Sequence, residues 1–163
     1  LVQQKAKRDA LSMVPNRYGL DDWLTRHFCT RDTAALTLLE VDVDHFKRIH
    51  DLRGNTAGDL VLRAAPMDWH AQRGNEFVAR VGGEESWLGC IGAEPAVAHA
   101  LAQRLRAGVA AQRVPAGAGH PALHCTVGIG VSEAFSDLAD RDLATRQADA
   151  ALYAAKVAAR DRS

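Results

Sequence analysis

The chain has 163 residues, the length of one ordinary domain, and its 47% hydrophobic and 25% charged residues indicate a folded globular protein. Twenty Lys and Arg balance twenty Asp and Glu, which excludes the positive excess needed for non-specific binding to nucleic acid or anionic membrane. Since the sequence shows neither a long apolar run nor a signal-peptide core, we expect a cytoplasmic domain that is not inserted in a membrane.

Two helical patterns open the chain. Residues 1–12 are polar, and we expect them to be the end of a helical linker from an upstream domain. Residues 18–28 carry Leu20, Leu24 and Phe28 at fourfold spacing, which predicts an amphipathic helix that packs through this stripe.

A predicted strand with acidic residues at its carboxyl end follows. Residues 36–43, with the sequence LTLLEVDV, predict a central strand, and Asp42 and Asp44 come at its carboxyl end. A short helix is expected around residues 44–50 and a longer one around 58–71.

The middle of the chain predicts a β-hairpin. Residues 76–81 and 86–91 both alternate with the period of two that is typical of strands. Between them stand Gly82, Gly83, Glu84 and Glu85, so we expect a turn of two glycines and two carboxylates.

The last third predicts a helix over residues 94–108 with Val97 on its inward face, a strand over 123–131 and a final helix over 138–160. Strands and helices do not alternate strictly. This order favours one α+β domain with a mixed sheet flanked by helices over a doubly wound fold.

Four carboxylates lie at the ends of these predicted strands. If the strands are neighbours, Asp42, Asp44, Glu84 and Glu85 crowd together, which is costly unless a cation is bound. Mg²⁺ prefers such oxygen ligands, and Lys47, one helical turn after Asp44, could hold a phosphate, as in phosphoryl transfer. The alternatives are a solvated hairpin tip and a helix N-cap.

Four motifs in order resemble the GGDEF family of diguanylate cyclases, which condense two GTP into cyclic di-GMP. DALSMVPNR at Asp9–Arg17 and DVDHFKRIHDLRGNTAGD at Asp42–Asp59 resemble the two upstream blocks. GGEES at Gly82–Ser86 resembles the GG(D/E)EF signature, and ADAALYAAK at Ala148–Lys156 resembles the terminal block. The resemblance implies one GGDEF-like domain over residues 1–163, a palm-like sheet and the signature on a β-hairpin.

The resemblance also implies roles for individual residues. Asp42, Glu84 and the carbonyl of Val43 would bind two Mg²⁺ ions, while Glu84, Glu85 and Lys47 would be catalytic. The implied nucleotide-binding residues are His50, Asp59, Arg80, Gly82, Gly83, Lys156 and Arg160.

Lys156 and Arg160 stand four residues apart on one helical face, where like charges repel by a few tenths of a kcal/mol. A bound phosphate between them would remove this repulsion. The alternative is that an exposed helix end tolerates it, because cations there suit the helix dipole.

The chain departs from the family pattern at two important positions. His50 replaces a guanine-reading Asn, and Ser86 replaces the Phe that anchors the hairpin. Trp87 cannot substitute for that Phe, since strand alternation places it on the other face. We therefore expect a binding module with weak or absent catalysis that senses GTP with Mg²⁺, or cyclic di-GMP; the alternatives are an active diguanylate cyclase and a purely structural dimerisation domain.

A second nucleotide site is implied by the family's R-x-x-D inhibitory motif. Arg73 stands nine residues before Gly82, and Glu76 occupies the position of the Asp. The alternative is a polar turn between helix and strand. The expected partners are GTP, cyclic di-GMP and an upstream sensor domain, and a homodimer is compatible with the pattern.

Overall fold

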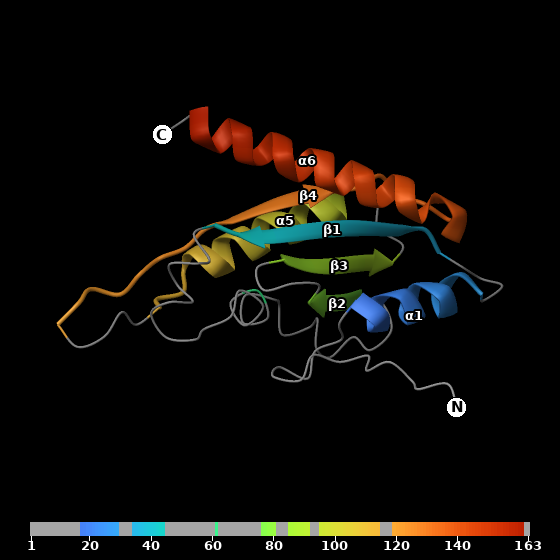
Figure 1. The fold of residues 1–163 in the computed structure, drawn as a ribbon, viewed down its shortest axis with the longest axis horizontal. Coiled ribbons are helices and arrows are strands. Elements are labelled where there is room, and N and C mark those ends of the chain that lie inside the picture. Colours follow the sequence, from blue (N-terminus) through green and yellow to red (C-terminus); the bar gives the residue numbers. More distant parts are fainter. Residues whose placement is uncertain are drawn as a thin grey trace.

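The structure is a computed structural model (Figure 1). It describes residues 17–29, 34–44, 61, 76–80, 85–91, 95–114 and 119–161.

A four-stranded sheet forms the middle layer of the described part. Its strands are β1 (Leu36–Val43), β2 (Glu76–Arg80), β3 (Glu85–Ile91) and β4 (Val127–Val131), in the spatial order β2-β3-β1-β4. Each neighbouring pair is antiparallel. The expected α+β class, with a central sheet flanked by helices, is confirmed, although the described strands form an antiparallel and not a mixed sheet. Strand β1 has the bounds that the apolar run predicts.

Helices cover both faces of this sheet (Figure 1). Helices α1 (Arg17–Phe28) and α6 (Arg141–Asp161) pack on one face, and α5 (Pro95–Ala110) packs on the other. A 3-10 turn, η1 (Leu138–Asp140), precedes α6, and the Asp137 carboxylate caps it by accepting from the amide of Ala139 at 2.9 Å.

Alternation along β1 divides the core into two clusters. Leu36 and Leu38 pack with α1 and α6, whereas Leu39 and Val41 pack with α5. All four are almost fully buried, and burial of each such side chain contributes roughly 1.5–3 kcal/mol. The next positions on the α1/α6 face belong to Glu40 and Asp42, so the same alternation carries two carboxylates into that layer.

The structure corrects two details of the predicted elements and leaves a third untested. Val97 is 57% exposed, while Ala98 is fully buried, so the inward face of α5, which also contains Leu101 and Leu105, does not include Val97. Strand β4 begins at Val127 and not at residue 123, since Leu123 pairs only with Val114 in an isolated bridge. The predicted helices over 44–50 and 58–71 lie outside the described residues, apart from the buried Val61.

Candidate nucleotide and metal site

The carboxylates of Asp42 and Glu85 come from neighbouring strands. Asp42 is the second-last residue of β1 and stands opposite Glu85 in the antiparallel register. Glu85 is the first residue of β3, so this strand begins one residue earlier than predicted. The prediction that Glu85 lies in the turn of the hairpin is wrong. Because directly opposite residues share one face of a sheet, both belong to the α1/α6 face.

Asp42 forms an ion pair that reaches across β4. Its Oδ2 atom accepts a hydrogen bond from Nζ of Lys156 in α6, with 20% and 28% of the two side chains exposed. Its other oxygen, Oδ1, is buried and has no hydrogen-bond partner among the described residues. A buried carboxylate oxygen without a partner is costly, so this atom is prepared to accept a cation or a donor.

Two glycines in β4 make this pair possible, and they have no assigned role in the sequence prediction. Gly128 stands opposite Asp42, and a Cβ atom there would lie 3.3 Å from Cε of Lys156. At Gly130 a Cβ atom would lie 2.0 Å from the carbonyl oxygen of Ala148. Helix α6 thus rests directly on the β4 backbone, which brings the lysine over the end of β1.

Glu85 is held by the aromatic residue two positions later. The indole Nε1 of Trp87 donates a hydrogen bond to Glu85 Oε1 at 2.7 Å. Trp87 is 6% exposed and lies in the α1/α6 cluster, whereas the adjacent Ser86 is buried opposite Val41 on the α5 side. The prediction that Trp87 and Ser86 face opposite sides of the sheet is confirmed.

A third carboxyl group, missed by the sequence prediction, lies behind this pair. Glu40 is opposite Trp87 and is 6% exposed. Burial, followed by the nearby carboxylates of Asp149 and Glu85, raises the pKa of Glu40 to about 9. The signal was present, since Glu40 interrupts an apolar strand two residues before Asp42 and therefore shares its face.

Asp44, the fourth acidic residue considered, is directed toward the start of β4. Its Oδ2 atom accepts from the hydroxyl of Thr126 at 2.7 Å, and its amide donates to the Thr126 carbonyl at 2.8 Å. Nearby, burial and then the Asp44 charge raise the pKa of the Cys125 thiol. Asp44 is thus tied to β4 and stands apart from the pair of Asp42 and Glu85.

The other predicted residues are only partly placed. Glu76 and Arg80 lie on β2 and Arg160 lies on α6, with their side chains outside the described part. The residues that lie wholly outside it are Lys47, His50, Asp59, Arg73, Gly82, Gly83 and Glu84.

The residues that are described fit Mg²⁺ on chemical grounds. Oδ1 of Asp42 is a hard oxygen ligand that is buried and has no partner within the described ranges, and the adjacent Val43 carries the carbonyl that is the second predicted ligand. Within the described ranges no three His, Cys, Asp or Glu side chains form a metal-binding group. The remaining predicted ligand, Glu84, lies outside those ranges.

The fold and this arrangement of carboxylates agree with one family of nucleotide enzymes. The family described as "Diguanylate cyclase, GGDEF domain" matches residues 6–162, and the chain belongs to it. It is accordingly a GGDEF domain of cyclic di-GMP signalling.

Individual relatives support the assignment. The chain is 36% identical over 163 residues to the diguanylate cyclase DgcP of Pseudomonas aeruginosa, covering 98% of this chain and 24% of DgcP. It is 30% identical to diguanylate cyclase DgcZ of Escherichia coli, covering 99% of this chain and 54% of DgcZ. The chain thus spans a quarter to about half of these relatives.

Solved structures show the same fold. The GGDEF domain of DgcB from Caulobacter crescentus, in complex with c-di-GMP, superposes with a TM-score of 0.75 at 28% identity, covering 98% of this chain and 92% of that one. Diguanylate cyclase SiaD of Pseudomonas aeruginosa, in complex with its activator SiaC, gives a TM-score of 0.74 at 30% identity, covering 94% and 59%. None of the described helices of this chain has an apolar stretch that could cross a membrane.

Proposed function

We propose that this GGDEF domain binds GTP with Mg²⁺, or cyclic di-GMP, as a regulatory module whose own cyclase turnover is weak or absent. The observation that carries the nucleotide part concerns Asp42. Its buried Oδ1 atom has no partner among the residues that the structure describes, while its Oδ2 atom pairs with Lys156. The proposal treats residues 1–163 as one module, with residues 1–12 as the end of an incoming linker. Because the GTP that the module would bind is in the cytoplasm, we expect the module to be located there.

In this proposal Asp42, the Val43 carbonyl and Glu84 would hold Mg²⁺. The metal would neutralise charge on the triphosphate. Besides the proposed metal ion, Asp42 has Lys156 as a neighbouring cation. The ammonium group of Lys156 can pair with a phosphate as well as with the carboxylate. Arg160, one turn further along α6, would add a second phosphate contact.

Weak turnover is supported by two substitutions in the motifs. Ser86 is buried on the α5 side of the sheet, where a larger apolar side chain would contribute roughly 1.5–3 kcal/mol of burial to holding the signature strand. His50 offers one donor and one acceptor in place of the planar amide of an Asn, which weakens recognition of the guanine edge.

An active diguanylate cyclase is the second candidate, and one observation favours it. Asp42 and Glu85 stand opposite each other with Lys156 beside them, so the described part of the acidic site is intact. Incubation with GTP and Mg²⁺ followed by separation of products distinguishes the two. We expect at most traces of cyclic di-GMP, and rapid conversion would favour the active enzyme.

The nucleotide proposal is tested by titration calorimetry with GTP in the presence and absence of Mg²⁺. Asp42→Asn keeps the shape of the side chain and removes its charge, so it should abolish the Mg²⁺-dependent part of binding. Asp142→Asn, an exposed acid in the first turn of α6, is the matched control and should bind as the parent does. Unchanged affinity in Asp42→Asn would overturn the proposed metal site.

Cyclic di-GMP is proposed to bind through Arg73 and Glu76. A guanidinium can pair with the O6 and N7 edge of guanine or with a phosphate, and Glu76 can accept from guanine donors. We expect micromolar affinity that Arg73→Ala largely removes and Glu76→Asp preserves. If Arg73→Ala binds as the parent does while Asp59→Ala does not, the ligand occupies the active half-site instead.

A further inference from the structure

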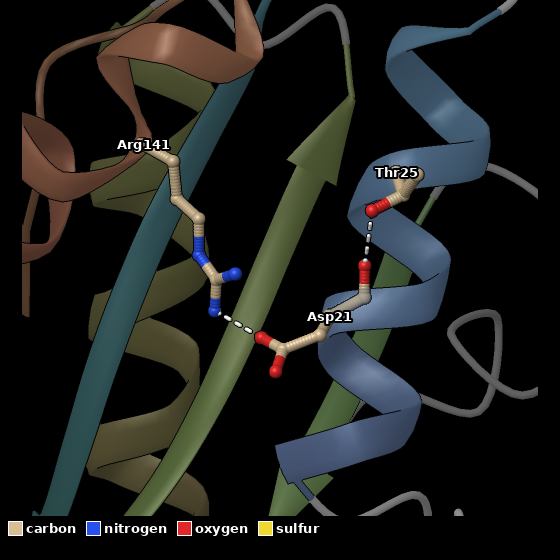
Figure 2. A network of polar contacts seen from close by, with 3 residues as sticks. All are labelled: Asp21, Thr25 and Arg141. Atoms are coloured by element: carbon tan, nitrogen blue, oxygen red, sulfur yellow. Dashed lines mark hydrogen bonds and ion pairs between the residues drawn. The ribbon is translucent and has the colours of Figure 1, made fainter. Parts of the chain in front are cut away.

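A cavity of about 430 Å³ lies between the α1/α6 helix layer and the sheet. Leu20 and Leu24 of α1 form one apolar side, and Leu38 and the indole of Trp87 form another. Arg141 lines the cavity from the start of α6 and reaches toward α1, where it pairs with Asp21 (Figure 2). The volume of the cavity is within the range of sites for small molecules.

Three carboxyl groups line the same cavity, from three different elements. They belong to Glu40 of β1, Glu85 of β3 and Asp149 of α6. Glu40 is more than nine-tenths buried, and its Oε2 atom has no hydrogen-bond partner among the described residues. The Glu40 side chain also contacts the carboxyl groups of Asp149 and Glu85, so the three form one cluster, and Oε2 is the oxygen that remains open to a donor from a ligand.

The charges of the described lining do not balance. Arg141 forms an ion pair with Asp21 of α1 (Figure 2). The backbone carbonyl of Asp21 also accepts a hydrogen bond from the Thr25 hydroxyl at 2.9 Å, within the same helix. Within the described ranges, no Lys, Arg or His forms an ion pair with Glu85 or Asp149. Burial and the neighbouring carboxylates raise the pKa of Glu40 to about 9 and keep it neutral at pH 7, so among the described residues Glu85 and Asp149 supply the negative charge of a largely polar lining that has an apolar side.

We propose that this cavity binds a small organic cation with a flat amidinium or guanidinium head and an apolar body. Such a head carries several N–H donors in one plane, which matches carboxyl oxygens presented from different sides. The apolar body would contact Leu24 and Leu38, and the indole of Trp87 can interact with a cation through its ring face.

An organic cation fits this lining better than a metal ion does. The described residues contain no three acidic or imidazole groups close enough to ligate one ion. The apolar walls of Leu20, Leu24 and Trp87 would also contribute nothing to a hydrated metal. The cavity shares Glu85 with the proposed nucleotide site but does not use Asp42 or Lys156, so the two proposals can fail independently.

The test is titration calorimetry of the 163-residue chain with benzamidinium, and with neutral benzamide as the isosteric control. We expect benzamidinium to bind at least tenfold more tightly than benzamide. In ¹H–¹⁵N spectra the indole resonance of Trp87, assigned by its loss in Trp87→Phe, should shift on addition of benzamidinium. Equal binding of the two compounds, or no shift of this resonance, would overturn the proposal.

Variants locate the binding site within the cavity. Asp149→Asn should weaken benzamidinium binding more than fivefold, because it removes a charge. Glu40→Gln exchanges one neutral hydrogen-bonding group for another and should weaken it less, whereas Asp142→Asn should leave it unchanged. Thermal unfolding of each variant verifies that it is folded. Benzamidinium binding that is insensitive to both substitutions would show that the compound binds elsewhere. GTP binding with Mg²⁺, measured on the same variants, reports separately on the nucleotide proposal.

Discussion

Asp42 combines a charged group, a largely buried side chain and a position opposite Glu85 in the sheet. Four-fifths of its side chain is buried, one oxygen is paired with Lys156 and the other has no partner in the described part of the chain. Removal of one member of a buried pair leaves an uncompensated charge, which costs more than the pair itself contributes. The local chemistry of the site is therefore dominated by the cation that faces Asp42.

Lys156→Met should lower the free energy of unfolding by about 1–3 kcal/mol, because it leaves the Asp42 carboxylate without its partner. Chemical denaturation measures this change. Lys156→Arg, which retains the charge, is the control and should lose less. Addition of Mg²⁺ should restore part of the stability of Lys156→Met if Asp42 is a metal ligand. Equal stability of Lys156→Met and the parent would contradict this account.

Glu40 makes stability depend on pH. Its pKa is raised from 4.5 to about 9 in the folded protein by burial and the carboxylates of Asp149 and Glu85. The folded state therefore binds the proton more tightly than the unfolded state does. The stability from this proton is fully present below pH 4.5 and is lost as the pH rises toward 9, at most about 1.4 kcal/mol per pH unit.

Glu40→Gln removes this titration, so its advantage in unfolding free energy over the parent should grow between pH 5 and pH 8. Urea denaturation at several pH values measures the difference. Glu133→Gln, at an exposed position, is the control for the substitution itself. A stability difference between Glu40→Gln and the parent that stays constant with pH would refute the assignment.

At the scale of the element, the contact between α6 and β4 determines where Lys156 lies. Ala148 and Leu152 of α6 pack against β4, whose Gly128 and Gly130 present bare backbone to the helix. A side chain at position 130 would lift α6 from the sheet, and one at position 128 would displace the side chains of Leu152 and Lys156, so either would disturb the contact of the lysine with Asp42. The two glycines are thus part of the site, although they have no reactive group.

Gly130→Ala should destabilise the protein by about 3 kcal/mol or more, because its Cβ atom would lie 2.0 Å from the Ala148 carbonyl oxygen and 2.5 Å from the Leu152 nitrogen. Gly89→Ala is the matched control on the same face, where the nearest atoms are side-chain carbons at 3.4 Å. It should change stability by less than about 1 kcal/mol. Thermal denaturation compares the two, and similar losses would disprove the proposed role of close packing.

At the scale of the whole molecule, the sheet brings together segments that are distant in sequence. Residues 85–91, 36–43 and 127–131 form its adjacent strands β3, β1 and β4, and α6, near the carboxyl terminus of the chain, packs against β4 (Figure 1). The acidic site therefore depends on the complete fold. The same holds for Ser86, a described position at which this chain departs from the family motif, because the packing of the sheet buries it.

The double substitution His50→Asn with Ser86→Phe should raise formation of cyclic di-GMP from GTP by at least tenfold, because it restores the planar amide and the aromatic anchor. Separation of products after incubation with GTP and Mg²⁺ measures this. The single variants show which change matters more. If the double variant is as inactive as the parent, the weakness lies elsewhere in the site.

Local patterns were sufficient for the elements whose environment is simple. The strand over residues 36–43 is continuous and apolar, and it matches β1 because a central strand is buried on both faces. The stripe of Leu20, Leu24 and Phe28 similarly predicts α1. The inward face of α5 was misjudged at Val97, because the packing of the helix decides which side of its first turn faces the sheet, and hydrophobicity alone does not.

The sequence by itself determined the class of fold, the family and the acidic residue near the end of β1, since all of these are encoded in short-range periodicity and motifs. Only the tertiary structure decided which groups meet: Lys156 with Asp42, Trp87 with Glu85, and Glu40 with Asp149. The physical reason is that these contacts depend on strand register and on how closely α6 approaches β4, which are set by packing between segments up to 114 residues apart.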